Sequence, residues 1–298
     1  MAGGYAMTVT NDRPVPLGWK SVLMLALLTV TGAGMFAWPL IVPASAPVDN
    51  SPFVFVALLP MLILLVLAQI SEAGIDAKAL AILGVLSAVN AALRPLGAGT
   101  NGIELVFFLL ILAGRVFGPG FGFVLGCTSM FASGLLTAGV GPWMPFQMLA
   151  AAWIGLGAGL LPHRLFGRSL RGKAEIGLLV VYGIVSAYLY GAIMNLWFWP
   201  FMTGPTGGQD VAYVPGGSLL INLKRFFWYT LITSTAIWDT GRAITNTVLL
   251  MLLGKPILFM FRRTVRRAAF NPDVAFLPPA TVSPTPDRPP AERLPAGL

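Results

Sequence analysis

The sequence predicts an all-α membrane protein, a polytopic helix bundle with about eight transmembrane helices. Apolar residues occupy 56% of the 298 positions and charged residues only 10%, whereas soluble domains carry about 25% charged residues. The mean hydropathy is +0.80. Too few polar groups remain to coat a water-soluble surface, so we expect the hydrophobic runs to lie in a lipid bilayer.

Eight hydrophobic runs are the candidate spans, because a helix needs about 20 apolar residues to cross the hydrocarbon core. The third and fourth runs are short, and only the tight turn in GRVFGPGFG joins the fourth to the fifth. In chain order the runs cover 19–41, 53–70, 77–93, 103–116, 118–138, 143–161, 176–198 and 226–253.

These runs divide the chain into four parts. Residues 1–18 form a polar segment that leads into a run long enough to span the membrane rather than to be removed as a signal peptide. Residues 19–76 hold the first two spans, and residues 77–270 hold the other six. The segment 271–298 is rich in proline and polar residues, which predicts a disordered tail.

The distribution of Lys and Arg predicts the orientation. With the N-terminus inside, fifteen basic residues fall on the inner side, and only Arg94, Lys224 and Arg225 fall on the outer side. The positive-inside rule then places both termini in the cytoplasm and the protein in the cytoplasmic membrane. The basic residues alternate with hydrophobic spans, so the net charge of +8 indicates a bilayer rather than nucleic acid as partner.

The sequence carries no signature of catalysis. It contains no phosphate-binding loop, no zinc-ligand spacing, no paired aspartates for a magnesium–diphosphate site and no G-x-S-x-G elbow. The single cysteine, Cys127, has no partner for an internal disulfide. We therefore expect no enzyme activity, no catalytic residue, no metal and no cofactor. We interpret His163, in a basic inner loop, as facing lipid headgroups.

Polar residues near the outer ends of the spans are the candidates for ligand binding, because a polar side chain in lipid is costly and usually faces a cavity or a partner. Gln147 lies one helical turn after Trp143, and an interfacial belt of aromatic residues does not explain an amide. Aromatic walls with a few amides suit an organic ligand. The candidate substrate-binding residues are Asn101, Glu104, Trp143, Gln147, Asn195 and Trp199.

A second polar set lies deeper, in the stretch WDTGRAITN. Asp239 and Arg242 are three residues apart and therefore share one helix face. We expect them to form a structural ion pair in which the two charges neutralise each other. Glu104 and Arg115 are candidates to join this charge balance.

Small residues form a third pattern. Gly155 and Gly159 lie in the sixth run, and Ala88-x-x-x-Ala92 is the clearest part of a stripe on the third run. Small residues at this spacing let another helix approach closely, either inside the bundle or from a partner. The whole stripe on the third run is Ala81, Gly84, Ala88 and Ala92.

The chain from about residue 79 to residue 270 resembles the substrate-specific S components of energy-coupling factor (ECF) vitamin transporters. The stretches that carry the resemblance are NAALRPLGAGTNGIEL, GRVFGPGFGFVLG, GVGPWMPFQMLAAAWIGLGAGLLP and TSTAIWDTGRAITN. S components of this kind have six core helices with both termini inside. The six spans from residue 77 match that pattern, and the first two spans are an addition to it.

The resemblance implies a vitamin-binding protein that docks on a separate transmembrane T component and two ATP-binding subunits. It implies a docking stripe on the first core helix, at Ala88 and Ala92. It implies a vitamin site on the outer side, under the loops 94–102, 139–142 and 199–225. The pattern GPW-x-P-F-Q-M is most similar to members associated with cobalamin or its precursors.

Two other functions fit the residues without the resemblance. One is a protein that acts on lipid, such as a flippase or a lipid-linked transferase. The other is a structural partner that stabilises another membrane protein through its small-residue stripe. Small molecules retained by the purified protein distinguish these functions from vitamin binding.

Overall fold

The computed structural model describes residues 19–41, 77–97, 100, 102–165, 167–202 and 210–268. The predicted second span, both terminal segments and Asn101 lie outside the described residues. The helices are α1 (Trp19–Phe36), α2 (Trp38–Ile41), α4 (Ala77–Leu96), α5 (Val106–Phe117), α6 (Pro119–Leu136), α7 (Met144–Leu160), α8 (Lys173–Met202), α9 (Leu219–Thr230), the π-helix η2 (Leu231–Asp239) and α10 (Thr240–Ala268).

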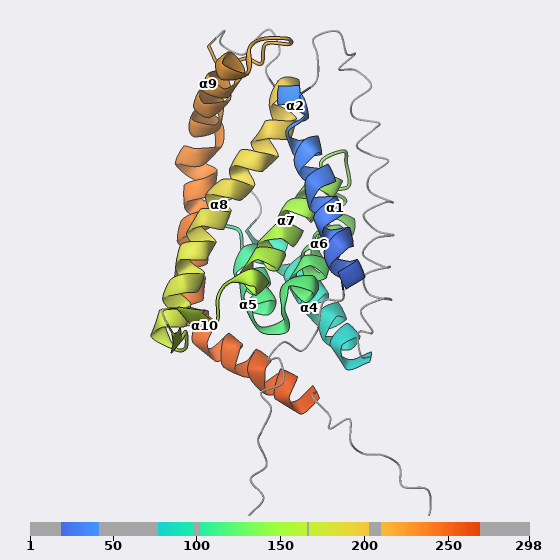
Figure 1. Ribbon diagram of the computed structural model, residues 1–298, viewed down its shortest axis with the longest axis vertical. Coiled ribbons are helices and arrows are strands. Elements are labelled where there is room, and N and C mark those ends of the chain that lie inside the picture. Colours follow the sequence, from blue (N-terminus) through green and yellow to red (C-terminus); the bar gives the residue numbers. More distant parts are fainter. Residues whose placement is uncertain are drawn as a thin grey trace, which may run out of the picture.

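The protein is a polytopic all-α membrane bundle, as its sequence predicts. Among the described residues, four helical segments are long and apolar enough to cross a membrane, namely Lys78–Leu96, Pro119–Leu136, Lys173–Phe201 and Leu219–Arg266. A short antiparallel hairpin between α7 and α8 pairs β1 (Arg164–Leu165) with β2 (Arg168–Ser169). Figure 1 shows α2 and α9 at one end of the molecule, here called the α9 end. The opposite end, which holds the strands, is called the hairpin end.

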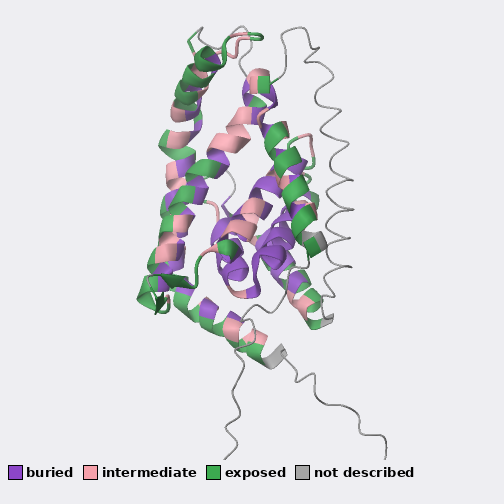
Figure 2. Cartoon of the chain, in the orientation of Figure 1, coloured by how far each residue is buried: buried purple, intermediate pink, exposed green. Residues whose placement is uncertain are grey.

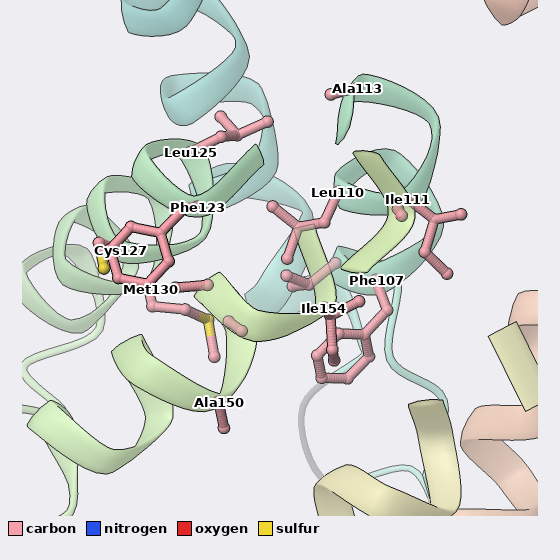
Figure 3. Close-up of a cluster of buried hydrophobic side chains, with 14 of the residues drawn as sticks. Phe107, Leu110, Ile111, Ala113, Phe123, Leu125, Cys127, Met130, Ala150 and Ile154 are labelled. Carbon is pink, nitrogen blue, oxygen red and sulfur yellow. The ribbon is translucent and has the colours of Figure 1, made fainter. Parts of the chain in front are cut away.

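Helices α5, α6 and α7 form the buried centre of the bundle (Figure 2). Every residue of α5 except Val116 is buried. With 12 residues, α5 is about 18 Å long and too short to cross a hydrocarbon core of about 30 Å. The fourth predicted span is therefore a helix surrounded by protein. Figure 3 shows side chains from all three helices meeting in this core, among them Phe107, Phe123 and Ile154.

Glycines allow the three central helices to approach at backbone distance. A Cβ atom on Gly155 of α7 would overlap the backbone of Gly122 on α6, and one on Gly126 would overlap Ala152. Gly159 lies equally close to Pro119 at the start of α6. The close helix contact predicted from Gly155 and Gly159 is thus confirmed, and it lies inside the bundle.

A single residue, Gly118, connects α5 to α6. Gly118 has φ of 103°, a value that side-chain-bearing residues rarely adopt. Pro119 then occupies the first turn of α6, where the missing N–H costs nothing and the fixed φ suits a helix. The GRVFGPGFG stretch therefore folds α6 back against α5.

Two long helical segments flank this centre. Helix α8 has 30 residues, and α9, η2 and α10 follow one another without a break from Leu219 to Ala268. Both are longer than the predicted runs 176–198 and 226–253. Helix α8 begins earlier, at Lys173, and continues through the apolar residues 199–202, and the last segment gains residues at both of its ends. In Figure 1 the last part of α10 crosses the hairpin end of the bundle, and α10 contains Pro256, a residue that kinks helices.

Helices α1 and α2 pack on the core through aromatic side chains. The ring of Phe36 lies 5.1 Å from that of Phe146 on α7 and 5.4 Å from that of Trp153. Trp38 Nε1 donates a hydrogen bond of 3.1 Å to the carbonyl of Trp197 on α8. This N-terminal segment covers part of the α7–α8 surface.

Candidate functional site

Arg242, in the first turn of α10, is the centre of a buried charge cluster. Its Nε and Nη2 donate to the two carboxylate oxygens of Glu104 at 2.9 and 3.0 Å. Its Nη1 donates to Asp239 Oδ1 at 2.8 Å and to the carbonyl of Ala187 on α8 at 3.2 Å. The sequence indicated the Asp239–Arg242 pair and the participation of Glu104. The structure brings all three together.

Aromatic rings enclose the guanidinium of Arg242. Its central carbon lies 4.8 Å from the ring centre of Tyr190 and 5.5 Å from that of Phe107. Both distances are within the range of cation–π attraction. Phe107 is fully buried and Tyr190 is 7% exposed, and Arg242 itself is only 5% exposed, so little of its charge is accessible from outside the bundle.

A hydroxyl donor and a glycine on α8 hold Asp239 in place. Ser234 Oγ donates to Asp239 Oδ2 at 3.0 Å from the nine-residue π-helix η2. A Cβ atom on Gly191 of α8 would overlap the Asp239 carboxylate, so only glycine permits this approach. π-Helical segments occur frequently at functional sites because they change which side chains share a face.

The loop before α5 carries Glu104 to this cluster. Gly102 has φ of 82° and packs against the backbone of Trp238 in η2. Since a Cβ atom at Gly102 would overlap the Trp238 carbonyl, the glycine permits the loop to lie on the last helix. The side chain of Glu104 remains 33% exposed, whereas that of Asp239 is fully buried.

A second polar pair lies close by. Arg94 Nη2, at the end of α4, donates to Gln147 Oε1 on α7 at 2.7 Å. Arg94, Glu104 and Arg242 all lie within electrostatic reach of Tyr190. The amide predicted to face a ligand therefore accepts a hydrogen bond from an arginine. Together the charge cluster and this pair form a polar layer, defined here as Arg94, Glu104, Gln147, Asp239 and Arg242.

Asn195 extends the polar groups along α8. It lies one helical turn after Gly191, the residue that contacts Asp239. Its Nδ2 is buried and has no hydrogen-bond partner among the described residues. A buried donor without an acceptor costs about 1–3 kcal/mol, which a ligand oxygen would recover.

Trp199 has a different environment from the one expected of a ligand-binding residue. It is fully buried, and its Nε1 donates to the carbonyl of Val211 at 2.8 Å. Its ring centre lies 5.2 Å from that of Tyr213. Burial raises the pKa of the Tyr213 hydroxyl above its ordinary value. These contacts hold the segment after residue 209 against α8.

Trp143 lies at the surface, 42% exposed. Its Nε1 donates to the carbonyl of Gly139 at 3.3 Å, and its ring covers Gly141. The contacts described for Trp143 are thus within its own turn, although Gln147 lies one helical turn further on. The structure places these two predicted neighbours in different surroundings.

The small-residue stripe of α4 faces outward. Ala81, Gly84, Ala88 and Ala92 are all exposed, and open space surrounds the Cα atom of Gly84. The opposite face of α4 holds the helix to α6, where Asn90 Nδ2 donates to Ser129 Oγ at 3.0 Å. The sequence left two uses open for this stripe, packing inside the bundle or contact with a partner. Among the described residues, the stripe is not used for packing inside the bundle.

Arg115 does not join the Asp239–Arg242 cluster, so that expectation is wrong. It lies at the hairpin end, where its Nε donates to Glu175 Oε1 at 2.8 Å. Glu175 also accepts from Arg262 at 2.6 Å. The sequence places Arg115 at the end of one span and Glu175 at the start of another, both on the predicted inner side. This shared location was the signal in the sequence that could have indicated the pair.

A comparison with family models identifies one family. The model described as the substrate-specific component of ECF transporters matches residues 78–253, more than half of the chain. No curated protein and no solved structure matches the chain. The match includes all five residues of the polar layer, and the protein belongs to the family of ECF transporter substrate-specific components.

Proposed function

We propose that this substrate-specific component captures a vitamin from outside the cell and delivers it through a T component and two ATP-binding subunits. In this proposal the protein lies in the cytoplasmic membrane with both termini in the cytoplasm. The α9 end then faces outward and the hairpin end faces inward. The six-helix core of residues 77–270 carries the binding site, and the first two spans are an addition.

The polar layer is the observation that carries the proposal. It joins residues from α4, α7, η2, α10 and the loop before α5, so several parts of the chain can respond to one ligand. Glu104 is partly exposed, and Asn195 offers a buried amide donor. A few directed polar groups within a largely apolar bundle are typical of sites for organic molecules.

The charge distribution supports the orientation. Six Lys or Arg side chains surround the cavity at the hairpin end, whereas the α9 end carries Lys224 and Arg225 among its described residues. Arg225 Nη1 donates to the carbonyl of Ala212, so it also ties α9 to the preceding segment. An excess of basic residues at one end favours the cytoplasmic side for that end.

The exposed stripe on α4 supports docking of the T component. Helices associate in lipid through close van der Waals packing, which small residues allow. Ala88 and Ala92 lie on the same exposed face, and the resemblance assigns docking to this position. A partner helix is therefore the proposed neighbour of this face.

Cobalamin or one of its precursors is the first candidate among the vitamins. The resemblance of GPW-x-P-F-Q-M supports it, as does the length of the loop 199–225. Amide groups on such a molecule would form hydrogen bonds with the side chains of Arg94, Gln147 and Asn195. Smaller vitamins such as riboflavin, biotin, thiamine and folate are the alternatives within the same function.

Mass spectrometry of small molecules retained by the detergent-purified protein tests this function. We expect one vitamin in stoichiometric amount, released by denaturation and restored by adding it back. Retention of phospholipid alone, with no vitamin from a panel that includes cobalamin restoring a complex, would contradict the proposal and favour a lipid substrate.

A further inference from the structure

A cavity of about 590 Å³ opens at the hairpin end, apart from the polar layer. It lies between the last turn of α5, the hairpin, the start of α8 and the second half of α10. Glu175 is the only carboxylate among its described lining residues. The cations around it are Arg115, Arg164, Arg171, Lys255, Arg262 and Arg266. A concave surface of one charge sign focuses its field and attracts counter-ions.

Arg115 forms the buried wall of this cavity and is 2% exposed. Its Nε donates to Glu175, and its Nη1 donates to the carbonyls of Leu161 and Pro162 at 2.9 and 3.2 Å. Its Nη2 is buried and has no hydrogen-bond partner among the described residues. Arg115 therefore keeps one guanidinium nitrogen whose donors no described residue uses.

Glu175 cannot neutralise the remaining charge. Its Oε1 already accepts from both Arg115 and Arg262. Arg164, Arg171, Lys255 and Arg266 have no ion-pair partner in the described part of the chain. The cavity therefore has four cations in excess of its internal salt bridges.

We propose that this cavity binds a phosphate group, carried by an anionic phospholipid or present as inorganic phosphate. Phosphate oxygens accept several charge-assisted hydrogen bonds, and guanidinium groups match their geometry. The volume exceeds that of phosphate alone and suits a headgroup. Phe259, which lines the cavity and is 62% exposed, offers apolar contact for the glycerol and acyl portion of a lipid.

Two charge-matched double variants of the full chain test the site. Arg171→Gln/Lys255→Gln removes two exposed cations from the cavity. Arg168→Gln/Arg263→Gln removes two exposed cations outside its lining. All four side chains are exposed, so both variants should fold, which helical circular dichroism and a monodisperse gel-filtration profile check. Vitamin affinity should be the same in both, because this site is independent of the proposed function.

Native mass spectrometry of delipidated protein measures binding of phosphatidylglycerol and phosphatidylcholine, and calorimetry measures binding of inorganic phosphate. We expect wild type and Arg168→Gln/Arg263→Gln to prefer phosphatidylglycerol, with affinity about tenfold lower in Arg171→Gln/Lys255→Gln. Phosphate binding lost only in the cavity variant, with the two lipids equivalent, would support the free anion as the source. If neither lipid nor phosphate distinguishes the cavity variant from its control, the proposal is overturned.

Discussion

Glu104 and Arg242, 138 positions apart, form a two-pronged ion pair with distances of 2.9 and 3.0 Å. The pair ties the loop between α4 and α5 to the first turn of α10. Because the same guanidinium also binds Asp239 and the carbonyl of Ala187, one side chain connects three parts of the bundle. A ligand that interacts with Glu104 would therefore act on all three.

Removal of Arg242 should damage the fold more than removal of Asp239. Arg242→Ala strands the fully buried Asp239 carboxylate, whereas Asp239→Ala leaves Arg242 paired with Glu104. Breaking a buried pair by deleting one partner costs about 3–5 kcal/mol. The yield of monodisperse protein should fall in the order wild type, Asp239→Ala, Arg242→Ala. If Asp239→Ala/Arg242→Ala is no better folded than Arg242→Ala, the Asp239–Arg242 pairing is wrong.

Gly191→Ala should destabilise the protein by about 1–3 kcal/mol, because the added methyl group overlaps the Asp239 carboxylate. The matched control is Gly177→Ala on the same helix, where a Cβ atom meets open space. That control should be neutral or slightly stabilising. Thermal unfolding followed by circular dichroism measures both. Equal melting temperatures for the two variants would contradict the close approach of α8 and Asp239.

Gly155→Ala tests the packing of the central helices. Its methyl group would meet backbone atoms of Gly122, which cannot move aside as a flexible side chain can. We expect a loss of about 1–3 kcal/mol or more in stability, measured by the same melting experiment against Gly177→Ala. A melting temperature equal to that of wild type would show that α6 and α7 lie further apart.

Bulk on the α4 stripe should impair assembly and leave ligand binding intact. Ala88→Trp/Ala92→Trp places two large side chains on an exposed face, where they would separate partner helices. The control Val181→Trp/Val185→Trp places the same side chains four residues apart on the exposed face of α8. We expect co-purification with the T component to be lost only in the α4 variant. Intact co-purification would remove the stripe from the docking surface.

The fold was predictable because apolar runs report directly on the helices that cross a bilayer. The GRVFGPGFG turn and the close helix contacts at Gly155 and Gly159 were also predictable, because glycine and proline have the same effects on the backbone in any environment. The 12-residue α5 was harder to interpret. A run such as 103–116 is equally apolar whether lipid or protein surrounds it, and only tertiary contacts distinguish the two.

The site was predictable in its residue types and less so in its pairs. Asp239 and Arg242 share a helix face, so their spacing alone indicated contact. Arg94 was noted as an outer basic residue. Its hydrogen bond to Gln147 joins residues that are 53 positions apart on two different helices, and no local sequence pattern predicts such a contact. Trp199 and Trp143 looked alike in the sequence, yet one is fully buried and the other is exposed.

The affinity of the retained vitamin for Gln147→Ala and Asn195→Ala tests the central claim most directly. Each variant removes a polar group proposed to contact the ligand. Thr247→Ala is the control, because its hydroxyl bonds only to the carbonyl of Ala243 in its own helix among the described residues. Calorimetry should show binding about ten- to a hundred-fold weaker in the first two variants and unchanged in the control, corresponding to a lost hydrogen bond of about 1–3 kcal/mol. Wild-type affinity in both Gln147→Ala and Asn195→Ala would contradict the assignment of the vitamin site to these residues.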